Sequence, residues 1–538
     1  MMDGLDSTVT ATAAPAIRAD LSGSYAELQW MTAAFTMALA VVLLMGGRLG
    51  DMFGRRRMLL IGVGGFVLAS MTCAMAATPA MLILARAAQG AFGAMMAPQT
   101  FGLIRDLFPP ADMKKAWTVL GPAIGLSAAA GPVVAGALIH ADLLGSGWRM
   151  IFLINVPIGG FALAVAARFL PSSSRAARRG RLDPLGVVLA AAGTFMLVFP
   201  LVQGRELGWP WWMAALAAGS VPVLALFAWH QIRQERSGVT PLIEMSVFGR
   251  RSYASGVAFA MVFSGAIGGT LLTLGVFMQV GLGYTPLRAG LTSMPWALGA
   301  MAGSGASGAL AARLGRRILH IGLIGMGAGL TLLYTVLEHA GTSMGSADFI
   351  APLFAFGIGM GIVFSPLFDI ILGDVADSEV GSASSVLQAI QQVGMSLGVA
   401  VIGTAFFALS GMRAQHNFDT FAGPRLRAAL ASAVVPAAPR DQVIAGVRAC
   451  IRDMEGENNP DIAPASCAIP RHFSFPGASR AIAAAGQGTH KRDYLDAAEA
   501  TTLIAVSLTA LAFALGFLLP AKAHAHAKSG PTSTRNRA

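Results

Sequence analysis

The chain has 538 residues, of which 55% are hydrophobic and only 12% are charged. Soluble domains carry roughly 25% charged residues, so this composition excludes a soluble protein built around one buried core. The net charge of +11 does not indicate nucleic-acid binding, because the lysines and arginines recur in short loops between apolar segments. The 64 glycines suit helices that pack closely in lipid. The composition therefore predicts an all-α polytopic membrane protein.

Apolar runs of about 20 residues, long enough to cross a bilayer as helices, recur along the whole chain. Thirteen of them are expected near residues 27–47, 57–77, 81–104, 115–139, 149–170, 184–203, 212–230, 255–280, 289–311, 318–337, 349–372, 385–410 and 500–520. The opening stretch, MMDGLDSTVTATAAPAI, is shorter and is typical of the second half of a helix. Counted as a truncated first helix, it brings the predicted number of transmembrane helices to fourteen.

Positive charge alternates between the connecting loops. The segments after the second, fourth, sixth, eighth and tenth helices are rich in arginine or lysine, and they include RLGDMFGRRR, RDLFPPADMKK and RLGRR. Loops after odd-numbered helices, such as AATPA, are poor in positive charge, while GDVADSEVGS after the twelfth helix breaks the pattern. Positively charged loops stay in the cytoplasm. The pattern therefore predicts a bacterial-type inner-membrane protein with both termini cytoplasmic.

A polar insert rich in proline and alanine, residues 411–496, interrupts the regular spacing and falls on the outer side by the same reasoning. It contains Cys450 and Cys467, and disulfides persist outside the cytoplasm. The pair could close a loop there, or remain as two unpaired thiols in a loosely ordered segment. Cys73, inside an apolar run, is expected to be a small packing residue.

A short internal repeat suggests two related halves. FGRRRMLLIG at 53–62 is similar to LGRRILHIG at 314–322. Repeated halves with a substrate site at their interface are typical of secondary transporters. The expected division is an N-terminal six-helix half, two central extra helices with linkers, five helices of the C-terminal half, the extracytoplasmic insert, the last helix and a basic cytoplasmic tail, at 1–170, 171–250, 251–410, 411–496, 497–520 and 521–538.

One loop resembles a known signature. GRLGDMFGRRR, residues 47–57, is similar to the loop between the second and third helices of the major facilitator superfamily. Gly47 and Gly54 permit a tight turn and close contact. Asp51 can accept hydrogen bonds from an arginine such as Arg55 or Arg56, or from a helix N-terminus. The resemblance implies a gating latch between the halves; the alternative is an anchor that only sets topology.

Further stretches resemble the fourteen-helix drug:proton antiporter family within that superfamily. They are LILARAAQGAFGA at 82–94, GPAIGLSAAAGPVVAGAL at 121–138, WRMIFLINVPIG at 148–159, LDPLG at 182–186, PLRAGL at 286–291 and GSASSVLQAIQQVGMSLGVAV at 381–401. In the second of these, Gly131, Pro132 and Gly136 stand in an antiporter motif and would let the helix pack tightly against the other half. The motif is degraded at Ser127 and Ala135.

The resemblance also implies a proton-coupling acid. Ionisable residues in mid-membrane are costly and therefore functional candidates. Asp6 stands in the block similar to the family's first helix, and Arg86 in the block with an intramembrane arginine. Burial raises a carboxyl pKa and a nearby arginine lowers it, so a group between these effects can bind and release a proton. The alternative is that Asp6 is a solvated acid near an exposed helix end.

Other polar residues are candidates for a substrate cavity. Asp3 lies one turn from Asp6 on the same helical face. Gln388, Gln391 and Gln392 offer uncharged contacts where some drug exporters of this family carry acids, which argues against a specialist for dications. The family's first helix has about ten further residues before the leucine–aspartate pair. Here four residues precede Leu5, which leads us to expect an upstream start codon; the alternative is a version of the protein without a working proton site.

Other classes of function are disfavoured. The chain has no Walker loop, and no HExxH motif or Cys/His metal cluster stands out, so we expect no enzyme, no metal and no cofactor, with a proton gradient as the energy source. The predicted function is proton-coupled export of drugs or other amphipathic small molecules by a monomer. Its substrate site would open alternately to the two sides of the membrane. A dedicated exporter of a metabolite, siderophore or lipid is the main alternative, and a membrane protein that transports nothing is a remote one.

Overall fold

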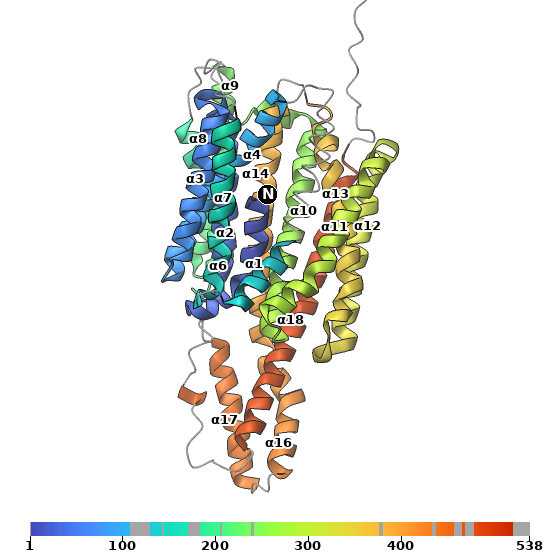
Figure 1. The fold of residues 1–538 in the computed structure, drawn as a ribbon. Coiled ribbons are helices and arrows are strands. Elements are labelled where there is room, and N and C mark those ends of the chain that lie inside the picture. The colour runs from blue at the N-terminus through green and yellow to red at the C-terminus, as the bar shows by residue number, and fades with distance from the viewer. Residues whose placement is uncertain are drawn as a thin grey trace, which may run out of the picture.

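The computed structural model describes residues 2–107, 130–142, 145–170, 183–204, 207–237, 241–375, 380–432, 437–456, 465–467 and 478–519. Within these ranges the chain is helical and contains no strand. Long helices run up and down a single bundle, and a smaller group of helices projects from one end (Figure 1). We call this end of the bundle the insert end. The tail 521–538 lies outside the described residues.

The N-terminal half contains α1 (Met2–Asp20), α2 (Tyr25–Phe53), α3 (Arg55–Ala74), α4 (Pro79–Leu107), an apolar helix over Ala130–Ala141, η2 (Gly147–Arg149), α6 (Met150–Leu153) and α7 (Asn155–Phe169). The central elements are α8 (Pro184–Gln203), α9 (Trp211–Arg236) and η3 (Met245–Gly249). The C-terminal half contains α10 (Arg251–Val276), η4 (Phe277–Gly281), α11 (Pro286–Leu314), α12 (Arg317–Ala340), η5 (Gly341–Ser343), η6 (Ser346–Phe349), α13 (Ile350–Leu372), α14 (Val380–Met412) and α18 (Ala478–Gly516).

Helix boundaries follow local chemistry. Ser24 caps α2: its hydroxyl accepts from the backbone N–H of Glu27 at 3.2 Å, and the Glu27 carboxylate accepts from the backbone N–H of Ser24 at 2.8 Å. This reciprocal pair satisfies two N–H groups that a helix start leaves open. Gly54 separates α2 from α3 with φ at +92°, a conformation that residues with a Cβ rarely adopt. The tight turn predicted at Gly54 is therefore present.

Eleven helices of the described residues are long and apolar enough to cross a membrane. The helices α1, α11 and Ala130–Ala141 are not among these eleven, so the count of fourteen remains a prediction. The outer surface of the bundle is apolar: Leu84, Phe161 and Phe169 are each more than 70% exposed. Because the exposure of so large an apolar surface to water is unfavourable, this outer surface of the bundle is expected to face lipid.

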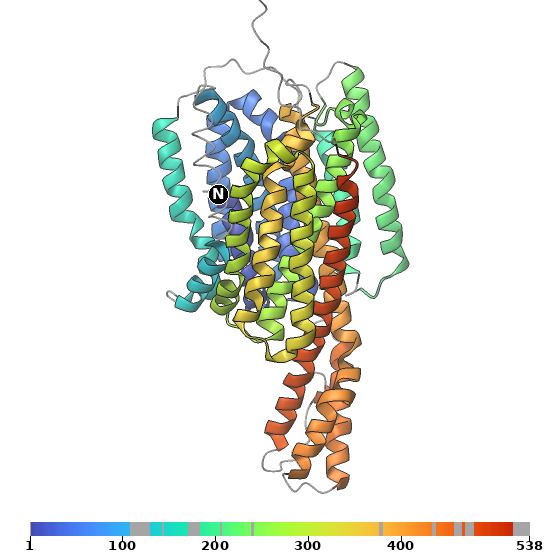
Figure 2. The same ribbon diagram turned by 90° about the vertical axis from the view of Figure 1, so that its right-hand side faces the viewer.

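The central pair packs across the junction of the two halves. The helix α8 contacts α2 of the N-terminal half and α14 of the C-terminal half, whereas α9 packs on α8 at the edge of the bundle (Figure 2). The central pair therefore does not form a separate domain, because α8 packs over the junction between the two halves.

The insert is a small helical unit rather than an irregular loop. It contains α15 (Ala414–Asn417), η7 (Phe418–Ala422), α16 (Gly423–Ser432), α17 (Ala437–Gly456) and η8 (Ala465–Cys467). Phe418, Leu426 and Leu430 share a buried core with residues of α17 and α18. The boundary predicted at 497 does not coincide with a helix end: α18 begins at Ala478, because its alanine-rich first turns favour a helix and pack on the insert.

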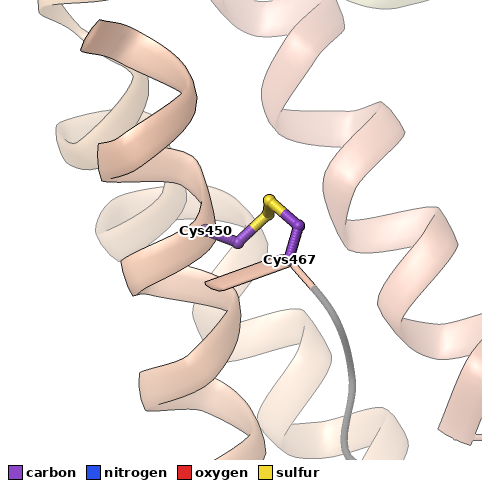
Figure 3. Close-up of a disulfide and its surroundings, with 2 residues drawn as sticks. All are labelled: Cys450 and Cys467. Atoms are coloured by element: carbon purple, nitrogen blue, oxygen red, sulfur yellow. A yellow bond between two sulfur atoms is a disulfide. The ribbon is translucent and has the colours of Figure 1, made fainter. Parts of the chain in front are cut away.

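A disulfide joins Cys450 in α17 to Cys467 in η8 (Figure 3). The two cysteines are 17 positions apart in the sequence. Closing such a loop restricts the unfolded chain and stabilises the insert by about 3 kcal/mol in the entropic description. Cys73 is buried in the bundle, as expected for a packing residue.

Replacing Cys450 and Cys467 by serine should expose the insert to proteases, because the disulfide no longer ties η8 to α17. We expect trypsin to cleave α17 of this variant several-fold faster, at Arg448 or Arg452. Reductant should accelerate the cleavage of the unaltered protein in the same way. The control, Cys73→Ala, should keep the slow, reductant-sensitive cleavage. A cleavage rate that neither reductant nor the double substitution changes would contradict the stabilising role.

Candidate functional site

Asp6 and Arg86 form a buried ion pair in the N-terminal half. The helix α1 starts about halfway along the bundle (Figure 1) and carries Asp6, which is 2% exposed. Arg86 in α4 is 1% exposed, and its Nη1 contacts Oδ2 of Asp6. The alternative of a solvated acid near an exposed helix end is therefore wrong.

The guanidinium of Arg86 has further partners. Its Nε donates to the backbone carbonyl of Met31 at 3.1 Å, and its Nη1 donates to Oε1 of Gln89 at 2.5 Å. The ring of Phe35 lies 4.1 Å from the guanidinium carbon, which adds a cation–π contact. The cation is thus held from α2 and α4 at once, which fixes its position opposite Asp6.

The second oxygen of Asp6 accepts hydrogen bonds from two amides. Gln89 Nε2 and Asn155 Nδ2 each donate to Oδ1 at 2.8 Å. Both amides also donate to the hydroxyl of Ser70, at 2.7 and 3.2 Å respectively. The carboxylate is therefore satisfied on both oxygens by residues from α4 and α7, as a buried charge requires.

Sequence reasoning missed Ser70, Gln89 and Asn155. Gln89 and Asn155 stand inside LILARAAQGAFGA and WRMIFLINVPIG, each as a lone amide in an apolar run. That isolation was a usable signal, because polar side chains in the membrane interior seek partners. The predicted neighbour Asp3 has a side chain outside the described residues.

The stretch WRMIFLINVPIG holds α1 at two points. Besides Asn155 at Asp6, Trp148 Nε1 and Arg149 Nη1 both donate to Oδ2 of Asp20 at 2.9 Å, at the far end of α1. The segment from η2 to α7 thus fixes both the buried and the exposed end of α1.

The glycine–arginine stretch contacts its own half, and one of its arginines lies near acids beside the central helices. Arg56 Nη2 donates to the backbone carbonyl of Ala167 in α7 at 2.6 Å, and Arg55 is the first residue of α3. Arg48 lies in the electrostatic field of Glu244 and Asp183. The surroundings of Gly47 and the side chain of Asp51 are outside the part of the structure that is described, so the predicted latch remains a hypothesis.

Asp183, from the LDPLG stretch, connects the central helices at the end opposite the insert. It caps α8 by accepting from the backbone N–H of Gly186 at 2.9 Å, and it accepts from Gln231 at 2.8 Å and pairs with His230 at 2.9 Å. Burial alone raises the pKa of Asp183, but these bonds outweigh it and hold the pKa below its usual value.

The predicted antiporter motif lies where the halves touch. A Cβ added to Gly136 would lie 2.4 Å from Cα of Leu287 in α11, and one added to Gly290 would lie 2.2 Å from the carbonyl oxygen of Pro132. On the other side of the same helix, Gly131 is in close contact with Thr8 of α1. The small residues let backbones of the two halves approach more closely than any larger side chain would allow.

A cavity opens beside this contact. It is lined by Thr8, Ala11 and Thr12 of α1 and by residues of α10, η4, α11, α12 and α13. Asp6 faces the N-terminal half, whereas Thr8 and Thr12 line the cavity, so α1 separates the ion pair from it. Three further candidates, Gln388, Gln391 and Gln392 of α14, do not line this cavity. Gln391 is only 8% exposed.

Comparison with known proteins identifies the family. A family model for the Major Facilitator Superfamily matches residues 1–399. The chain belongs to this superfamily. It is accordingly a multi-pass membrane transporter of small molecules and not an enzyme. Its fold is similar to that of a bacterial homologue of the human lysosomal transporter Spinster, in an inward-facing and unoccupied conformation, with 16% identity, a TM-score of 0.59 and 96% and 95% of the two chains covered.

Several relatives of this transporter are named as exporters or resistance proteins. A probable actinorhodin transporter of Streptomyces coelicolor is 44% identical over 97% of this chain and 90% of its own length. A tetracenomycin C resistance and export protein of Streptomyces glaucescens is 33% identical over 75% of this chain and 73% of its own. A puromycin resistance protein of Streptomyces alboniger is 36% identical over 74% and 78%.

The contact between the halves predicts a position-dependent effect of one methyl group. Gly290→Ala should destabilise the transporter by about 1–3 kcal/mol, because the new Cβ collides with the backbone of Pro132. The control is Gly305→Ala on the same helix, where a Cβ would have no atom within 4 Å. The melting temperature of the Gly305→Ala variant in detergent should be unchanged or raised. Equal effects of the two substitutions would contradict the close contact.

The ion pair predicts strong coupling between its two members. Asp6→Asn or Arg86→Gln alone leaves a buried charge without its partner, which costs about 3–5 kcal/mol. The double variant should lose less than the sum of the two. As a control, the exposed pair Asp20 and Arg149 should couple by less than about 1 kcal/mol in the same cycle. Additive losses at Asp6 and Arg86, measured by thermal unfolding, would show that the pair is not coupled.

Proposed function

We propose that this transporter exports amphipathic small molecules of the antibiotic type in exchange for protons, by alternating access. The observation that carries the proposal is the 44% identity, over nearly the whole chain, to a probable actinorhodin transporter, together with a carboxylate buried against an arginine inside the bundle. The family resemblance of the Asp6 and Arg86 blocks supports the same mechanism.

The proton step follows from the surroundings of Asp6. Arg86 pairs with this carboxylate, so a movement of Arg86 away from Asp6 would leave a buried charge without its partner, which the binding of a proton neutralises. The amide of Asn155 faces Asp6 with its Nδ2, and its Oδ1 is buried without a hydrogen-bond partner in the described part of the chain. A turn of this amide by about 180° would bring Oδ1 to Asp6 as an acceptor for a proton on the carboxyl group. Proton entry supplies about 2.3 kcal/mol per charge for each 100 mV, which drives export against a gradient.

A dedicated exporter of one compound is the second candidate. Three of the relatives carry names that refer to a single compound, which is actinorhodin, tetracenomycin C or puromycin. The mechanism would be the same, with the cargo restricted to one natural product of the producing cell.

The proposed setting is the inner membrane of a bacterial cell, with a monomer as the working unit. Arg316, in the junction between α11 and α12, donates to the backbone carbonyls of Phe517 and Leu519, at the end of α18 that lies away from the insert. This positive charge supports a cytoplasmic place for that end of the bundle, and we propose the same side for both termini. The disulfide in the insert supports an outer place for the other end.

Transport into inside-out vesicles tests the proposal. The cargos are ethidium, a neutral lipophilic drug and actinorhodin, and the pH gradient is imposed and then collapsed. We expect uptake that needs the gradient and that Asp6→Asn reduces at least about 100-fold, since loss of the proton carrier removes the driving force. The control is Asp441→Asn in the insert, which should retain uptake, because Asp441 is 67% exposed and lies outside the buried pair.

The outcomes separate the candidates. Gradient-dependent uptake of all three cargos supports a multidrug exporter, and uptake of actinorhodin alone supports the dedicated one. Uptake that persists in Asp6→Asn, with insertion of both variants verified, would contradict the coupling role of Asp6. Absence of uptake of every cargo by correctly inserted protein would contradict both candidates.

A further inference from the structure

Trp296 carries an unused hydrogen-bond donor at the cavity beside α1. Trp296 of α11 lines this cavity and is only 6% exposed. Its indole Nε1 is buried and has no partner among the described residues. A buried N–H without a partner is destabilising, and a ligand that brings a hydrogen-bond acceptor would satisfy it.

The other polar groups of the lining are already engaged as donors. The hydroxyls of Thr12, Thr270 and Ser293 donate to carbonyls of their own helices at 2.7 to 3.0 Å. Gln279 Nε2 donates across the cavity wall to the carbonyl of Thr12 at 2.7 Å. Trp296 is thus the lining residue whose nitrogen stands buried without a partner.

The rest of the lining excludes charge. Among the described residues that line the cavity there is no aspartate, glutamate, lysine, arginine or histidine. Leu274, Leu333 and Phe356 contribute apolar walls, and Trp296 and Phe356 add aromatic faces. A charged group would lose its hydration here without compensation, whereas a flat apolar ring would bury its surface against these side chains.

We propose that this cavity binds an uncharged ring portion of the cargo through a carbonyl-type acceptor that receives the Trp296 N–H. The inference rests on the proposed export function and names its substrate class: neutral ring systems bearing an acceptor, rather than cations. Since there is no carboxylate among the described lining residues, we place cargo and proton on opposite faces of α1, where they do not compete for one acid. Proton binding and cargo binding are then coupled through the position of α1. Asp6 fixes one face of this helix, and the other face lines the cavity.

A matched pair of ligands tests the site directly. Fluorenone and fluorene share one ring skeleton and differ by a single carbonyl acceptor. Binding to the purified full-length protein in detergent, measured by equilibrium dialysis, needs no proton gradient and is therefore independent of the export mechanism. We expect fluorenone to bind more tightly than fluorene, and Trp296→Phe to weaken fluorenone binding about three- to tenfold while fluorene binding stays unchanged.

The control variant is Trp229→Phe, which alters a tryptophan that is 54% exposed on α9. It should leave the binding of both ligands unchanged. Equal binding of the two ligands to the unaltered protein, or an equal loss of both in Trp296→Phe, would overturn the proposal. If binding behaves as expected but no cargo is transported in vesicles, the proposed export function fails while the cavity assignment stands.

Discussion

The ion pair between Asp6 and Arg86 is the constraint on which the N-terminal half is organised. Two charges out of water are stable only when each is paired and its remaining hydrogen-bonding atoms are satisfied. Here that requirement brings together α1, α2, α3, α4 and α7, through Met31, Ser70, Gln89 and Asn155. Hydrophobic packing between apolar helices is unspecific in lipid, so these polar contacts supply the specificity that places α1.

The helix α1 then serves both sides of the bundle. Its one face carries Asp6, and its other face contributes Thr8 and Thr12 to the cavity against the C-terminal half. The 148–159 segment holds this helix at Asp6 and at Asp20, which gives a structural reason for so distinctive a stretch of sequence. A change in the charge of Asp6 would alter the contacts of α1 on one face and thereby the walls of the cavity on the other.

The contacts between the halves include two kinds that are formed by small residues. At Gly136 and Gly290 backbones approach each other with no side chain between them, while at the centre the hydroxyls of Thr36 and Ser396 hydrogen-bond between α2 and α14. Contacts of small residues have little side-chain entropy to lose and can separate and reform as rigid bodies. Such contacts suit two halves that move against each other as rigid bodies. The helix α8 packs across the junction between the halves and must accommodate this movement.

The amino-acid sequence by itself determined the membrane class, the positions of most spans and the two charged candidates, because long apolar runs and rare intramembrane charges are local signals. It did not determine the amide partners of Asp6, the place of the three α14 glutamines outside the cavity, the start of α18 at Ala478 or the unused donor of Trp296. Those depend on which faces of distant helices meet. Only the packed tertiary structure decides that, since each helix offers several polar or small residues and the bundle brings just some of them together.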